Sequence, residues 1–177
     1  MYEREKQMVS EKTSSVAVVM GSNSDMAVMQ NCVEMLKNFE IKPIVRIISA
    51  HRTPQIVAEF AEKAADRGIK VIIAAAGMAA HLAGALAART TLPVIGVPLD
   101  CGGGLAGIEA LLSTVQMPPG VPVATVAVGK AGAENAAVLA VQILALSDKT
   151  LAGKLAQFKK AQQEKVVEKD EALQENY

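Results

Sequence analysis

The chain has 177 residues, 51% of them hydrophobic, and its 18 Lys and Arg residues balance its 18 Asp and Glu residues. This length suits one domain with a sizeable core, and the lack of a basic excess argues against nucleic-acid binding. With only two cysteines and no uninterrupted apolar segment of the ~20 residues that span a bilayer, we expect a soluble cytoplasmic protein that has no disulfide framework and does not enter membranes.

Short apolar runs alternate with helical stretches along most of the chain. The predicted strands are residues 16–20, 41–48, 69–75, 91–97 and 121–128. The predicted helices are residues 25–39, 54–67, 81–89, 105–115 and 131–146. Thr53 before Pro54 is typical of a helix start, Gly68 is typical of a helix end, and Pro98 is expected to stop the fourth strand.

Five strands that alternate with helices predict an α/β fold, a three-layer sandwich with a parallel, doubly wound sheet. A flavodoxin-like strand order is the expectation for five strands. We place the α/β domain at residues 15–147, after a disordered lead-in at residues 1–14. Residues 148–177 are rich in Lys, Glu and Gln and predict a C-terminal helix, which packs either on its own subunit or on a neighbouring one.

The turn after the first strand contains Gly21, Ser22, Ser24 and Asp25. Ligands of an open parallel sheet bind outside the carboxyl ends of its strands, and a helix N-terminus offers unpaired amides to an anion. The hydroxyls of Ser22 and Ser24 suit phosphate oxygens, whereas the carboxylate of Asp25 suits ribose hydroxyls. Serine and aspartate are also ordinary helix caps, so this turn alone leaves a structural role open.

The turn after the second strand contains Ser49, His51 and Arg52. An imidazole takes up and releases protons near neutral pH, which suits His51 to acid/base chemistry. The planar guanidinium of Arg52 stays charged and suits phosphate. A surface histidine beside a surface arginine is the alternative interpretation.

The turn after the third strand runs from Ala76 through Gly77 to His81 and Leu82. Its small residues leave backbone amides accessible to a ligand. His81 stands near a helix start, where capping or a structural hydrogen bond is the alternative role. The chain has two histidines, and both fall on turns at the same predicted edge of the sheet, which favours an active site.

Several other kinds of chemistry are not indicated. No cluster of Cys, His and carboxylate residues has metal-ligand spacing, and no GxSxG nucleophile motif is present. A receiver domain needs an Asp at the end of a central strand, where this chain has Ala74, Ala75 and Ala76. Aromatic residues to stack on a flavin are nearly absent. We therefore expect neither a metal nor a cofactor.

Three motifs are similar to those of the N5-carboxyaminoimidazole ribonucleotide mutase family of bacterial purine synthesis: GSNSD (21–25), SAHRTP (49–54) and AGMAAHLAG (76–84). STVQMPPGVP at residues 113–122 matches as well, and the similarity covers residues 16–147 in family order. The resemblance implies a flavodoxin-like fold, a ribonucleotide substrate, no cofactor, and a homo-octamer with sites at subunit contacts.

By motif position, the resemblance also implies the roles of individual residues. His51 matches the catalytic histidine of the family, and His81 a second, supporting histidine. The implied substrate-binding residues are Ser22, Ser24, Asp25, Ser49, Arg52, Gly77, His81 and Leu82.

The implied reaction converts N5-carboxyaminoimidazole ribonucleotide to 4-carboxy-5-aminoimidazole ribonucleotide, a step of IMP biosynthesis. The N-carboxylate leaves as CO2, and ring carbon C4, which the amino group makes nucleophilic, attacks that CO2 while the pocket holds it nearby. His51 is expected to remove the C4 proton and to protonate the departing nitrogen. The nearest rival is the related carboxylase, which uses free CO2 and in which Lys is expected at the position of Arg52.

The chain departs from the family pattern at three places. Met78 stands where a second glycine is usual, Ala83 where proline is common, and residues 100–104 (DCGGG) differ from the usual sequence. All three places lie near the expected carboxylate end of the pocket, and none changes the predicted sugar-phosphate residues.

Overall fold

The computed structural model describes residues 14–102 and 104–175. Its strands form one parallel sheet in the order β2-β1-β3-β4-β5. The strands are β1 (Val16–Met20), β2 (Ile44–Ile47), β3 (Val71–Gly77), β4 (Val94–Leu99) and β5 (Ala124–Thr125). This arrangement confirms the predicted parallel, doubly wound sheet with flavodoxin-like order.

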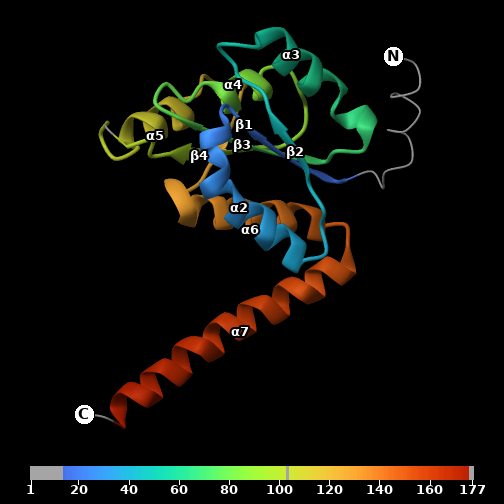
Figure 1. Ribbon diagram of the computed structural model, residues 1–177. Helices are drawn as coiled ribbons and strands as arrows, with labels where there is room; N and C mark the ends of the chain where they lie inside the picture. The colour runs from blue at the N-terminus through green and yellow to red at the C-terminus, as the bar shows by residue number, and fades with distance from the viewer. Residues whose placement is uncertain (1–13, 103, 176–177) are drawn as a thin grey trace. The chain divides into compact units, whose positions relative to one another are not determined.

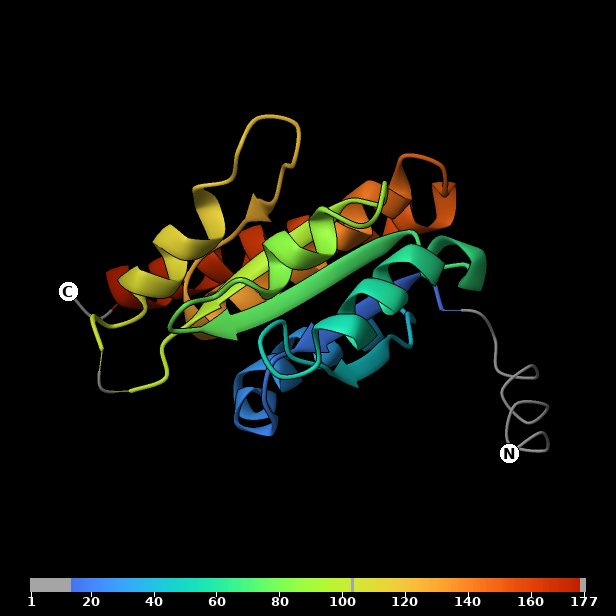
Figure 2. The same ribbon diagram turned by 90° about the horizontal axis from the view of Figure 1, so that it is seen from above.

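Helices cover both faces of the sheet. In chain order, the helices that the structure describes are α2 (Met26–Asn38), α3 (Pro54–Lys63), α4 (Leu82–Ala87), α5 (Ile108–Val115), α6 (Gly129–Ala145) and, in a separate C-terminal unit, α7 (Lys149–Gln174). Short 3-10 turns occupy Asn23–Asp25 and Ala65–Arg67. Figure 1 shows α3, α4 and α5 on one face of the sheet and α2 with the start of α6 on the other. In Figure 2, viewed from the side of α3 and α4, these two helices lie in front of the strands.

The core is built around the interior strands of the sheet, among them β1, whose five residues are all fully buried. Because alternate side chains of a strand point to opposite faces, Ala17 and Val19 contribute to the core under α3 and α4, whereas Val16, Val18 and Met20 face the other way. The helical residues of the core under α3 and α4 include Val57, Phe60, Leu82, Ala83 and Leu86. Burial on both faces explains why β1 is a continuous apolar run rather than an alternating one.

Four of the five predicted strands have other bounds in the structure. The third runs over Val71–Gly77 instead of 69–75, and the fifth is shortened from 121–128 to Ala124–Thr125. Proline is involved at the other two. The second strand begins at Ile44, directly after Pro43, and not at Ile41. The fourth strand was expected to stop before Pro98 but continues to Leu99. Since β5 pairs with β4 only at Ile95 and Gly96, the later part of β4 is an edge on that side, where a missing N–H breaks no ladder bond.

The chain divides into two compact units, Met1–Ala140 and Val141–Tyr177. In the second unit, Asp148 caps α7, because its Oδ1 accepts the backbone N–H groups of Thr150 (2.9 Å) and Leu151 (3.1 Å). Most of the α7 side chains are exposed, including those of Val166, Val167 and Leu173. In the part of the chain that the structure describes, no helix combines the length and apolar character needed to cross a membrane.

Candidate active site

A pocket of about 550 Å3 lies at the carboxyl ends of the parallel strands. The chain leaves β1 toward β2 on one side of the sheet and leaves β3 toward β4 on the other. The connections therefore diverge between β1 and β3, which is the position at which open α/β sheets bind ligands. The turns after β1, β2 and β3 and the residue Cys101 after β4 line the pocket.

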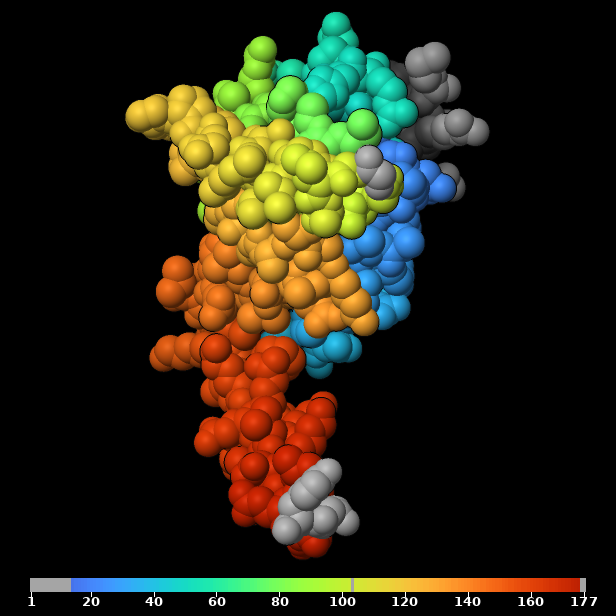
Figure 3. Space-filling model, turned by 90° about the vertical axis from the view of Figure 1, so that its left-hand side faces the viewer, coloured from blue at the N-terminus to red at the C-terminus, as the bar shows by residue number. Residues whose placement is uncertain are grey.

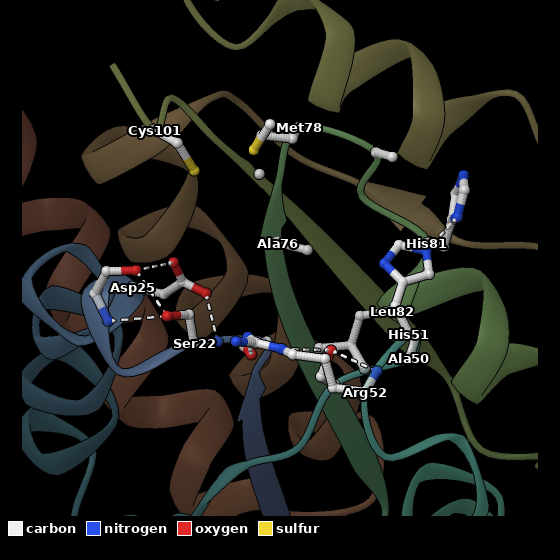
Figure 4. A pocket seen from close by; sticks show the side chains of 15 residues that line it. Ser22, Asp25, Ala50, His51, Arg52, Ala76, Met78, His81, Leu82 and Cys101 are labelled. Carbon is white, nitrogen blue, oxygen red and sulfur yellow. Dashed lines mark hydrogen bonds between the residues drawn. The ribbon is translucent and has the colours of Figure 1, made fainter. Parts of the chain in front are cut away.

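The structure brings every residue of the predicted site into this one pocket (Figure 4). These residues are Ser22, Ser24, Asp25, Ser49, His51, Arg52, Gly77, His81 and Leu82. They come from segments that are far apart in the sequence and meet only because the strands are parallel and adjacent. Their convergence is a structural finding, while their roles toward a ligand remain predictions.

The first turn is a capping box that also holds a buried carboxylate. Oδ2 of Asp25 accepts the backbone N–H of Ser22 (3.0 Å), and Oγ of Ser22 accepts the backbone N–H of Ser24 (3.3 Å). The Ser24 hydroxyl lies 2.9 Å from Ser22 Oγ and 3.2 Å from Asp25 Oδ1. Because it has a single proton, it can donate a hydrogen bond to only one of these two oxygens at a time. Asp25 is only 7% exposed, yet a carboxylate has more lone pairs than these contacts use. The capping role and a ligand role are thus compatible.

Arg52 ties the first two turns together. Its NH2 group donates to the carbonyl oxygen of Gly21 (2.6 Å), and its Nε donates to Ser49 Oγ (3.4 Å). A guanidinium has five N–H donors, so several remain for an anion in the pocket. The side chain is exposed on the pocket wall and already held in place before a ligand arrives.

Thr53 and Pro54 start α3 as predicted, but the threonine does not cap the helix with its side chain. Its Oγ1 instead accepts the N–H of Ser49 (2.9 Å) and donates to the Ser49 carbonyl oxygen (3.1 Å). These two bonds fix the turn that carries His51 and Arg52.

The two histidines of the chain form a pair at the pocket wall. Nε2 of His51 lies 2.8 Å from Nδ1 of His81, and the rings meet edge to face at 79° with centroids 4.9 Å apart. His81 occupies the N-cap position of α4 but makes no side-chain cap bond. Figure 4 shows the His51 ring with one edge toward His81. Capping, the alternative role for His81, is therefore not what its side chain does.

The turn after β3 lies beside Cys101, which was not among the predicted site residues. A Cβ on Gly77 would overlap Cys101 Sγ and lie 3.0 Å from the Leu99 carbonyl oxygen, so glycine at this position lets the loop after β4 approach the pocket. Met78, which replaces a usual glycine of the family, has a left-handed φ of 54°. That backbone costs a residue with a Cβ roughly 1–2 kcal/mol. The sequence signalled this region only through its departures from the family pattern.

The remaining lining residues lie on the predicted turns but were not among the predicted site residues, and they are small or apolar. They are Gly21, Ala50, Ala76, Met78 and Ala79. A second pocket of about 440 Å3 shares Met78, Ala79 and Cys101 with the first and is also lined by Glu109 and Ser113. Cys101 thus lies where the two spaces adjoin.

Cys101 is expected to be alkylated slowly at neutral pH and faster as the pH rises. Its pKa is raised by partial burial and then by the negative charges of Asp25, Asp100 and Glu109. Because only the thiolate reacts, the iodoacetamide rate should climb about tenfold per pH unit below the raised pKa. Mass spectrometry after timed alkylation measures the rate.

Cys32 is the internal control for this experiment, because burial raises its pKa to about 12. A ligand bound in the pocket should protect Cys101 and leave the unreactive Cys32 unaffected. Equal alkylation of both thiols, or no protection by ligand, would contradict the placement of Cys101 at the pocket.

The pocket combines groups that can bind a sugar phosphate with groups that can move a proton. A fixed cation, a buried carboxylate and serine hydroxyls meet the needs of phosphate and ribose, and an imidazole pair can move a proton. Within residues 14–102 and 104–175, no group of three or more His, Cys, Asp or Glu side chains is placed to hold a metal ion.

Comparisons with known proteins agree with this geometry. The AIR carboxylase family profile matches residues 15–165. An N5-carboxyaminoimidazole ribonucleotide mutase of Escherichia coli K12 is 52% identical over 153 residues, which cover 86% of this chain and 90% of that protein. A protein of the same name from Saccharolobus solfataricus is 54% identical over 143 residues, covering 81% and 89%. The crystal structure of PurE from Treponema denticola superposes with a TM-score of 0.79 at 31% identity, covering 89% of this chain and 97% of that one.

The matched residues include all four turns that line the pocket, from Gly21 to Cys101. The identity of about 50% to relatives over most of both chains and the superposition on a solved structure point to the same family. The chain belongs to the AIR carboxylase family.

Proposed function

We propose that this chain converts N5-carboxyaminoimidazole ribonucleotide to 4-carboxy-5-aminoimidazole ribonucleotide, with His51 as the acid/base group. The observation that carries the proposal is the convergence of His51, Arg52, Asp25 and Ser22 in one pocket. The curated relatives at about 50% identity bear the name of this mutase. The activity belongs to purine biosynthesis and needs no redox chemistry.

Substrate binding follows from the donors and acceptors that the pocket leaves unused. We assign the phosphate to the free N–H groups of Arg52 and to the hydroxyls of Ser22 and Ser24, because charged planar donors hold phosphate well. Asp25 would repel a phosphate, so its remaining lone pairs are assigned to ribose hydroxyls. These assignments place the aminoimidazole toward His51 and the small turn at Gly77.

Proton transfer is the task left to His51. Loss of CO2 from the exocyclic nitrogen requires a proton on that nitrogen, which the imidazolium donates. The ring carbon C4 then forms a bond to CO2, and the neutral imidazole takes the proton from C4 while the C–H electrons restore the aromatic ring. The proton given in the first half equals the proton taken in the second, so the histidine ends as it began. Backbone N–H groups of the turn after β3 are placed to hold the carboxylate.

The test is an assay for the C4-carboxylated product with the carbamate as substrate, in the absence of ATP and added metal. A 13C label in the carbamate carboxyl group distinguishes the two activities that the family names suggest. The mutase is expected to retain the label in unlabelled bicarbonate buffer. Product formed only from aminoimidazole ribonucleotide and bicarbonate would instead support the direct carboxylase, and no product from either would refute the proposal.

We also propose that the chain assembles as a homo-octamer. The residues Leu105, Ile108, Leu112 and Val115 recur at three- and four-residue intervals along α5 and the turn before it, and each is 48–67% exposed. The α5 segment lies on the surface turned to the viewer in Figure 3. An exposed apolar stripe of this kind favours contact with another subunit. The exposed apolar residues of α7 support the same role for the C-terminal helix.

Sedimentation equilibrium is expected to give a mass eight times that of the 18.5 kDa chain. Leu112→Lys should reduce this mass, because a charge on an apolar contact is costly to bury. Asp66→Lys, a charge change at an exposed position of the 3-10 turn Ala65–Arg67 and outside both α5 and α7, is the control and should leave the mass unchanged. A wild-type mass of a single chain would contradict the octamer.

A cytoplasmic location completes the proposal. It is supported by Cys32 and Cys101, which are both free thiols, as expected in a reducing compartment. Cell fractionation with an antibody against the chain tests it, and recovery in the membrane or secreted fraction would contradict it.

A further inference from the structure

We propose that His81 is a positioning residue whose Nδ1 accepts the Nε2–H of His51, so that the Nδ1 of His51 is the atom that exchanges protons with the substrate. This inference rests on the proposed acid/base function of His51. It adds to that function the identity of the reacting nitrogen and the group that selects it.

Only one proton can lie between the two nitrogens that join the His51 and His81 rings. Nε2 of His51 and Nδ1 of His81 are 2.8 Å apart, so in the neutral pair one nitrogen donates and the other accepts. If His51 donates, both rings hold their proton on Nε2. If His81 donates, both hold it on Nδ1. Free histidine favours the Nε2–H tautomer, so the first arrangement is the better one for both rings.

Within the described residues, His81 is the only side chain that hydrogen-bonds to His51. The other ionisable side chains lining the pocket are Asp25, Arg52 and Cys101, and their hydrogen bonds involve other partners or none. The tautomer of His51 is therefore set by His81 rather than by a carboxylate. The Asp of a Ser-His-Asp triad performs the corresponding task for its histidine.

This arrangement suits both halves of the reaction. The two nitrogens of an imidazole point in nearly opposite directions, so a ring whose Nε2 is bonded to His81 presents its Nδ1 away from that contact. In the imidazolium, Nδ1–H donates its proton to the departing nitrogen of the substrate. In the neutral ring, the Nδ1 lone pair takes the proton from C4. The Nε2–H bond to His81 persists throughout, so the ring need not turn between the two transfers.

The direct test is solid-state NMR of the full-length protein labelled with 15N-histidine. With two histidines in the chain, only four ring nitrogens contribute signals, and His81→Asn leaves only those of His51. At a pH at which both rings are neutral, the wild type should show protonated Nε2 and unprotonated Nδ1 in both rings. A protonated Nδ1 on His51 would overturn the proposal.

Kinetics of two substitutions separate positioning from a merely structural role. His81→Leu removes the acceptor and should lower kcat between about 10-fold and 100-fold with little change in KM, the range seen when a hydrogen-bond partner that orients a metal-ligating histidine is lost. His81→Asn should recover most of the activity, because its Oδ1 can accept the same hydrogen bond. Since the His81 side chain is exposed and caps nothing, both variants are expected to fold.

The outcomes distinguish this inference from the function on which it rests. A wild-type protein that makes no product from the carbamate contradicts the proposed function, whatever the NMR spectrum shows. An active wild type whose His81→Leu variant keeps full kcat overturns the positioning role alone. Equal losses in His81→Leu and His81→Asn also overturn it, because the hydrogen-bond acceptor would then not matter.

Discussion

Replacing His51 with Asn is expected to lower kcat by at least about 100-fold, the low end of what general acid/base groups contribute. Asparagine can still accept and donate hydrogen bonds but cannot exchange a proton at neutral pH. Both proton transfers of the proposed reaction should slow, whereas the contacts of Arg52, Asp25 and Ser22 with the ribose phosphate should persist. Steady-state kinetics with the carbamate, together with calorimetric titration of the stable carboxylated product, measure the two effects separately.

The fold of this variant should be preserved, because the His51 side chain is exposed and exposed substitutions usually change stability by less than about 0.5 kcal/mol. A urea unfolding curve that matches the wild type therefore validates the comparison. Near-normal turnover in His51→Asn would remove this histidine from the mechanism. Loss of product binding as well as turnover would mean that His51 is chiefly a binding residue.

Replacing Arg52 with Ala is expected to weaken product binding by about 10-fold to 100-fold, as follows from the roughly 1.5–3 kcal/mol of a hydrogen bond to a charged group. The variant loses the cation assigned to the phosphate. It also loses the bond to the Gly21 carbonyl oxygen, which holds the first two turns together. The effect should appear mainly in KM and in the dissociation constant, and less in kcat.

Two further arginine variants sharpen this prediction. Arg52→Lys keeps the charge but not the planar fork and should recover only part of the affinity. Arg89→Ala removes another exposed arginine, one that pairs with Glu62 (3.2 Å) outside the pocket, and should bind the product as the wild type does. An unchanged dissociation constant in Arg52→Ala would refute the phosphate role.

Local sequence patterns were sufficient for the number and order of the elements and for the sheet edge at which the pocket lies. The apolar run of β1, the proline at the start of α3 and the left-handed Gly68 after Arg67 report on conformations that neighbouring residues decide among themselves. The alternation of strands and helices then implied a parallel sheet, whose carboxyl ends all lie at one edge. That geometric rule is why turn residues from separate parts of the chain could be assigned to a single pocket.

Contacts between turns could not be derived in this way. His51 and His81 are 30 positions apart, and the 2.8 Å between their nitrogens depends on how the turns after β2 and β3 are shaped on either side of β1. Cys101 reaches the pocket only because Gly77 leaves room for its sulfur. Neither relation has a local period that a sequence pattern would reveal.

From the sequence alone, the number, type and order of the strands and helices could be predicted, and therefore the sheet edge at which the turn residues gather. Only the tertiary structure decided which of these side chains touch, how far β4 extends past Pro98, and which nitrogen of His51 is bonded to its neighbour. The reason is physical: backbone preferences act over a few residues, whereas contacts of 3 Å between loops are set by the packing of the whole sheet and its helices.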